Sequence, residues 1–173
     1  MREEIAKKHN IYKVFNDIAL KNEIVIFGSD FAAGFPFYEL SKKHLLSNAI
    51  YNRSIEGITI PEVCEILDEC VFKAHPSKVF YIFKVENEND LNCYKKILEK
   101  TKTALSSSKI YILSSPSEAE NSNINTALKS IVNEYNAEYI SIDYSKDCET
   151  IYRRLSPFFR NGKITFSEAF QLA

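Results

Sequence analysis

Short apolar runs alternate with helical patterns along most of this chain, and this alternation restricts the fold more than any other feature. The runs are rich in β-branched and aromatic residues, as buried strands are. They occupy residues 23–27, 49–51, 78–83, 109–113 and 138–142. Helical patterns lie at 3–20, 61–74, 91–105 and 122–135. Strands joined by helices form right-handed crossovers, so the sequence predicts a five-stranded parallel sheet between two helical layers, a three-layer α/β/α sandwich.

Length and composition indicate a single domain, residues 1–173, that begins with a helix in residues 1–22. The 22 basic and 23 acidic residues give a net charge of −1, which argues against nucleic acid as a partner. The first residues lack the apolar segment of a signal peptide, and no apolar run approaches the roughly 18 residues of a membrane span. We therefore expect a cytoplasmic location and no membrane span.

Neither the cysteines nor the acidic residues form a recognisable metal motif. The four cysteines lack the close spacing of zinc or redox sites, so we expect reduced thiols: Cys64, Cys70, Cys93 and Cys148. Five carboxylates fall in or near the loops that follow strands: Glu56, Glu86, Glu88, Asp90 and Asp143. They could gather around a divalent cation, but a solvated acidic rim is favoured because the ligand spacing of known cation loops is missing. A glycine-rich phosphate loop is missing too, and we expect no cofactor.

Polar residues follow the first three predicted strands, where ligands of parallel α/β sheets bind. The three segments are Gly28-Ser29-Asp30, Asn52-Arg53-Ser54-Ile55-Glu56-Gly57 and Asn87-Glu88-Asn89-Asp90. Each segment taken alone is better explained by a plain turn or helix cap than by a functional role. The order of the three segments carries more information than any one of them.

That order resembles the SGNH, or GDSL, hydrolases, especially the branch similar to the platelet-activating-factor acetylhydrolases. In this family Gly-Asp-Ser follows the first strand, Asn-Arg-Gly-Ile-x-Gly the second and Gly-x-Asn-Asp the third. The resemblance covers roughly residues 23–172 and implies the SGNH-hydrolase fold, which is flavodoxin-like, and chemistry on ester bonds. It also implies that Gly57 and Asn89 hold two of the three oxyanion-hole positions.

The catalytic positions depart from the family pattern. Gly28-Ser29-Asp30 places Asp30 where the family has its nucleophilic serine, and Ser29 where it has the aspartate. A one-residue displacement at the start of a helix turns a side chain by roughly 100°, so Ser29 should not point where the family's serine points.

The general base of the family is also missing from its expected place. Family members carry an Asp-x-x-His motif near the end of the chain, and its histidine takes the serine proton. Here Ile164 or Thr165 falls on the histidine position, depending on the alignment. All three histidines lie far upstream: His9, His44 and His75.

Three functional hypotheses follow from these features. The leading one is a catalytically degenerate SGNH-like protein that keeps a pocket for a small acyl or ester-like ligand, or for a protein partner. The alternative is an active GDSL-class esterase that uses Ser29 or Asp30 with an unrecognised base. The third is a flavodoxin-like binding or signalling domain that shares only the alternating pattern.

Overall fold

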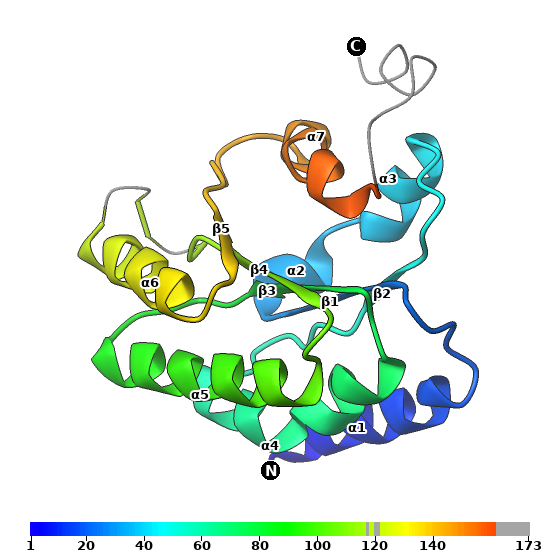
Figure 1. Cartoon of the computed structure of the whole chain (residues 1–173), viewed down its shortest axis with the longest axis horizontal. Coiled ribbons are helices and arrows are strands. Elements are labelled where there is room, and N and C mark those ends of the chain that lie inside the picture. Colours follow the sequence, from blue (N-terminus) through cyan, green and yellow to red (C-terminus); the bar gives the residue numbers. More distant parts are fainter. Residues whose placement is uncertain (117, 120–121, 162–173) are drawn as a thin grey trace.

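A five-stranded parallel sheet forms the centre of the molecule (Figure 1). The computed structural model describes residues 1–116, 118–119 and 122–161. The strands are β1 (Ile24–Gly28), β2 (Ile50–Asn52), β3 (Lys78–Ile82), β4 (Lys109–Leu113) and β5 (Glu138–Ile140). They lie in the order β2-β1-β3-β4-β5, and all four pairings are parallel. The predicted three-layer α/β fold is thereby confirmed.

Helices cover both faces of the sheet (Figure 1). One layer contains α1 (Glu3–Asn16), α4 (Ile60–Cys70), α5 (Glu88–Ala104) and α6 (Asn123–Glu134), and the other contains α2 (Asp30–Gly34), α3 (Phe37–Lys43) and α7 (Cys148–Phe159). A short 3₁₀ helix, η1 (Phe72–Ala74), follows α4. Each layer closes its own apolar core against the sheet. Every residue of β1 and β3 is therefore buried, which explains why both strands are apolar except for Lys78 at the start of β3.

Local signals account for the start of several helices. Before α4, the carboxylate of Glu62 accepts hydrogen bonds from the backbone N–H and the hydroxyl of Thr59, and Pro61 occupies the first turn. The side chains of Asn87, Ser122 and Asp147 accept a backbone N–H at the starts of α5, α6 and α7.

Some helices differ from the sequence prediction. The first helix ends at Asn16 rather than at residue 20, which leaves the side chains of Ile18 and Leu20 exposed beyond it. α2 and α3 are not among the predicted helices, because helices of 5 and 7 residues are too short to establish a helical period. α7 is not among them either, because its interior Pro157 resembles a helix break.

The strand order places a crevice at the carboxyl ends of β1 and β3. The chain leaves β1 toward α2 on one face and leaves β3 toward α5 on the other. Neighbouring strands whose connections diverge in this way leave an opening in which ligands of open α/β sheets bind. Among the residues that the structure describes, no helix is long and apolar enough to cross a membrane.

Candidate functional site

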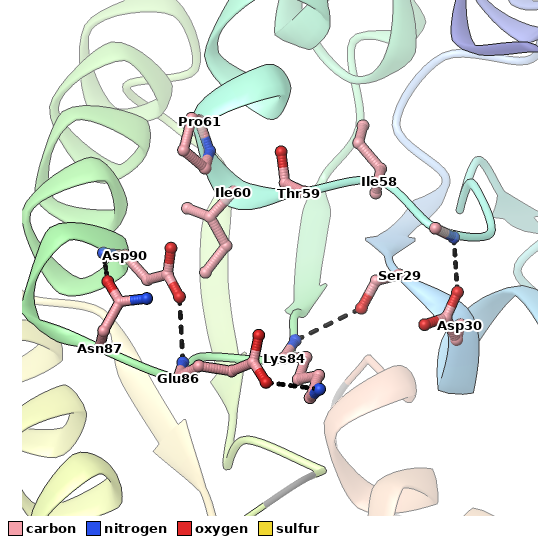
Figure 2. A pocket seen from close by; sticks show the side chains of 11 residues that line it. Ser29, Asp30, Ile58, Thr59, Ile60, Pro61, Lys84, Glu86, Asn87 and Asp90 are labelled. Atoms are coloured by element: carbon pink, nitrogen blue, oxygen red, sulfur yellow. Dashed lines mark hydrogen bonds and ion pairs between the residues drawn. The ribbon is translucent and has the colours of Figure 1, made fainter. Parts of the chain in front are cut away.

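A cavity of about 400 Å³ lies in the crevice beyond β1 and β3 (Figure 2). Its walls come from the ends of β1 and β3, from the loop before α4 and from the start of α5. The lining residues are Ser29, Asp30, Gly57, Ile58, Thr59, Ile60, Pro61, Lys84, Glu86, Asn87 and Asp90. Residues from all three predicted segments therefore meet in one place.

Ser29 is the residue before α2, and its side chain is turned toward β3. Its Oγ accepts the backbone N–H of Lys84 at 3.3 Å, and its own N–H donates to the carbonyl of Ile82 at 3.1 Å. The residue is only 4% exposed. These contacts fix the hydroxyl against the end of β3, at the edge of the cavity (Figure 2).

Asp30, the first residue of α2, points in a different direction from Ser29 (Figure 2). Its Oδ1 accepts the backbone N–H of Gly57 at 2.5 Å. Gly57 has a φ of +69°, in the left-handed region that favours glycine, and this conformation turns its N–H toward α2. The N–H that the family resemblance assigns to the oxyanion hole is thus bonded to a carboxylate.

The second segment is held against the first by main-chain and side-chain hydrogen bonds. The N–H of Arg53 donates to the carbonyl of Ile26 at 2.8 Å, and that of Ile55 donates to Gly28 at 3.0 Å. The side-chain amide of Asn52 donates to the carbonyl of Ala32 in α2 at 2.8 Å. These hydrogen bonds hold the loop that carries Gly57 against β1 and α2, next to Asp30.

The third segment contributes Asn87 and Asp90 to the cavity, but not Asn89. Asn87 is the N-cap of α5, and its Oδ1 accepts the N–H of Asp90 at 3.0 Å. Figure 2 shows the amide nitrogen of Asn87 turned toward the cavity. Asn89 lies inside the first turn of α5, is exposed and does not line the cavity. The sequence signal that could have identified Asn87 is its place directly before a helix, as an N-cap.

Lys84 is a second cavity residue that the sequence analysis did not single out. Its Nζ lies 2.6 Å from Oε1 of Glu86, and this contact raises the pKa of Lys84, with a smaller contribution from the charge of Asp30. Asp90 accepts the backbone N–H of Glu86 at 3.0 Å. Among the described residues, the lining of the cavity therefore contains three carboxylates, Asp30, Glu86 and Asp90, and one ammonium group.

Histidine is missing from the lining of this cavity. His44, which is buried, pairs with Glu149 at 2.7 Å and stacks on Tyr152, in the layer of α3 and α7. Ile164 and Thr165, the predicted positions of the missing family histidine, lie outside the described residues.

The five carboxylates near the strand ends do not gather into one cluster in the described part of the chain. Of the five, Glu86 and Asp90 line the cavity, whereas Glu56, Glu88 and Asp143 do not. Within the described ranges, no group of three or more acidic, histidine or cysteine side chains could hold a metal ion. All four cysteines are unpaired.

Several solved structures share this architecture, and an esterase and a lipase are among them by name. A protein from Streptococcus pneumonia named for platelet activating factor shares 17% identity over 91% of this chain and 94% of that one, with a TM-score of 0.68. A GDSL-like lipase from Bacteroides thetaiotaomicron shares 14% identity over 77% of each chain, with a TM-score of 0.56. An acetylxylan esterase from Geobacillus stearothermophilus shares 12% identity over 70% of this chain and 77% of that one, with a TM-score of 0.54. The chain has the SGNH/GDSL hydrolase fold.

This fold confirms the architecture that the family resemblance implied. No protein-family model and no curated protein matches the sequence. At these identities the structural likeness establishes the SGNH/GDSL fold and leaves the activity to be argued from the residues in the cavity.

Proposed function

We propose that this chain is an SGNH-fold binding protein that does not hydrolyse esters and that uses the cavity for a small acyl or ester-like ligand. The observation that carries this proposal is the hydrogen bond from the N–H of Gly57 to the carboxylate of Asp30. Acyl transfer needs N–H donors directed at the oxygen that becomes negative in the transition state. Here that donor is engaged by a negative charge of the protein itself, and an incoming oxyanion would be repelled by it.

The nucleophile provides a second argument for the absence of hydrolysis. A serine hydroxyl is almost entirely protonated at neutral pH and attacks only with the help of a nearby base. Ser29 is buried, its Oγ faces the N–H of Lys84, and the cavity lining contains no imidazole. The side chain of Asp30 already accepts the N–H of Gly57, and it lies beside the position where negative charge would develop.

The charges in the cavity restrict the ligand. The described lining of the cavity, with three carboxylates and one ammonium group, has a formal charge of −2, which disfavours anionic ligands. The ammonium group of Lys84 and the amide of Asn87 are donors that an ester or amide oxygen can accept from. A small uncharged ligand with an acyl group therefore fits this cavity better than a free acid.

A hydrolysis assay tests the proposal. The native chain, Ser29→Ala and Asp30→Ala are each incubated with p-nitrophenyl acetate and p-nitrophenyl butyrate. All three should release nitrophenolate at the background rate. Turnover by the native chain that is lost in either variant would show an active esterase with a base that the cavity geometry does not reveal.

Ligand binding is tested separately with triacetin, an uncharged acyl ester. Its addition should shift the backbone amide resonances of Gly57 and Asn87 in a two-dimensional NMR spectrum, while those of exposed residues on α6 should stay in place. Unchanged resonances at Gly57 and Asn87 with triacetin in the millimolar range would contradict the proposed ligand class.

Reconstruction of the family motif separates the missing base from the altered nucleophile. The exchange Ser29→Asp with Asp30→Ser restores the family order, yet it should stay near background, because loss of the base alone costs on the order of 10⁶-fold in rate. Adding Thr165→His or Ile164→His, each with an acid three residues earlier, should be the change that makes hydrolysis measurable. Brisk hydrolysis by the exchange variant without an added histidine would refute the argument.

A further inference from the structure

A groove of about 340 Å³ lies on the α1 side of the sheet edge, away from the cavity beyond β1 and β3. It runs between the end of α1 and the edge strand β2. Its lining residues are Tyr12, Phe15, Ile18, Ala19, Ile50, Tyr51, Asn52 and Arg53. The walls are mostly apolar or aromatic, and Arg53 is the one charged residue among them. Its volume falls at the lower end of the range for pockets that bind small molecules, roughly 300–1,000 Å³.

Arg53 lies at the base of this groove among three aromatic rings. Its guanidinium carbon is 4.9 Å from the ring centre of Tyr12, 5.7 Å from that of Phe15 and 5.8 Å from that of Tyr51. The residue is only 3% exposed. Phe15 and Ile18, at 46% and 78% exposure, form the outer rim. The guanidinium thus lies beneath a rim whose outer side chains are exposed to solvent.

The charge of Arg53 is poorly compensated. Its guanidinium makes one hydrogen bond within the described part of the chain, from Nη1 to the carbonyl of Tyr12 at 3.2 Å, and it forms no ion pair there. An arginine carries five N–H donors and stays protonated in proteins, although burial lowers the pKa of Arg53. A buried charge is costly unless it is paired and hydrogen-bonded. The carbonyl end of α1 and the three rings offset part of this cost.

We propose that the groove binds an amphiphilic carboxylate, whose head group pairs with Arg53 and whose alkyl chain lies along Phe15, Ile18 and the outer side of β2. One guanidinium matches one carboxylate in charge, and its planar fork can donate two parallel hydrogen bonds to it. The remaining surface offers an alkyl chain the apolar contacts that it needs. This site is separate from the cavity at Ser29 and does not depend on the function proposed for it.

The test is isothermal titration calorimetry with the full chain and four probes: octanoate, octanol, octylammonium and acetate. Octanoate should bind. Octanol has the same alkyl tail but no charge, and its dissociation constant should be higher by about tenfold or more. Octylammonium and acetate should show no measurable binding. Equal binding of octanoate and octanol would refute the role of Arg53, and absence of octanoate binding would refute the site.

Two matched variants locate the binding without disturbing the core. Phe15→Glu places a carboxylate on the rim, where it can pair with Arg53 and compete with octanoate. Val14→Glu makes the same charge change at a neighbouring, 64% exposed residue that does not line the groove. Phe15→Glu should weaken octanoate binding by about tenfold or more, and Val14→Glu should stay within about twofold of the native chain. Equal effects of the two variants would overturn the proposal.

Discussion

The substitution Gly28→Ala tests how closely β1 and β3 must approach at the candidate site. Gly28 is the last residue of β1 and pairs with Ile82 of β3. A Cβ atom added to Gly28 would lie 2.3 Å from the carbonyl oxygen of Ile82 and 2.7 Å from the Cβ of Ala32. One of these contacts is with backbone, so no side-chain rotation can relieve it, and β1 and β3 have to separate.

The expected cost has two parts. Overpacking of a well-packed core costs about 1–3 kcal/mol. Separation of the strands also weakens the hydrogen bond from the N–H of Ser29 to the carbonyl of Ile82, now 3.1 Å, which is worth about 1 kcal/mol. The free energy of unfolding should therefore fall by about 2–4 kcal/mol, a large part of the roughly 5–15 kcal/mol typical of a domain.

Urea unfolding followed by far-ultraviolet circular dichroism measures this change. Gly34→Ala is the matched control, because a Cβ atom there meets nothing within 4 Å, and its free energy of unfolding should change by no more than about 0.5 kcal/mol. The reasoning is refuted if Gly28→Ala unfolds at the same urea concentration as the native chain, or if the two alanine variants lose stability equally.

Two further predictions concern the loop before α4 and the first turn of that helix. Gly57→Ala should lower the free energy of unfolding by about 1–2 kcal/mol. The cause is backbone strain alone, since the φ of Gly57 is +69° and the added Cβ meets open space. A urea midpoint equal to that of the native chain would contradict this prediction. Hydrogen bonds, chiefly from Arg2, lower the pKa of Glu62 to about 2 from an ordinary value of 4.5. The stability that Glu62 contributes is therefore complete above about pH 4.5 and is lost as the pH falls toward 2. The difference in free energy of unfolding between the native chain and Glu62→Gln should shrink over that interval. A difference that stays constant from pH 6 to pH 2.5 would refute the assignment.

The strands could be predicted from the sequence because each is a short apolar run whose burial the sheet requires. All five strands begin and end within two residues of the predicted positions. The strand order could not be predicted in the same way, because it depends on which face each crossover helix covers. The helices of the α2, α3 and α7 layer were missed, since short helices and a helix with an internal proline give a weak periodic signal.

The sequence predicts the candidate site best at residues that follow directly after a strand, because the end of the strand sets their position. Ser29, Asp30 and Gly57 meet at the cavity, as expected for loops that follow adjacent strands. Asn89 does not reach it, because α5 begins at Glu88 and not at Leu91. The apolar periodicity of α5 starts only with Leu91, so the polar first turn of this helix was predicted as part of a loop.

The order of two neighbouring residues links the proposed loss of the nucleophile to the proposed loss of the oxyanion hole. Ser29 stands before α2 and faces the N–H of Lys84, whereas Asp30 stands in the first turn and faces the N–H of Gly57. The family order would place a hydroxyl on the Gly57 side and a carboxylate on the Lys84 side. Under the proposed function, the interchange removes the hydroxyl from the position of attack and, in the same step, engages the oxyanion donor with a negative charge. Reversing it frees Gly57 but supplies no base, which is why the exchange variant should remain inactive until a histidine is added.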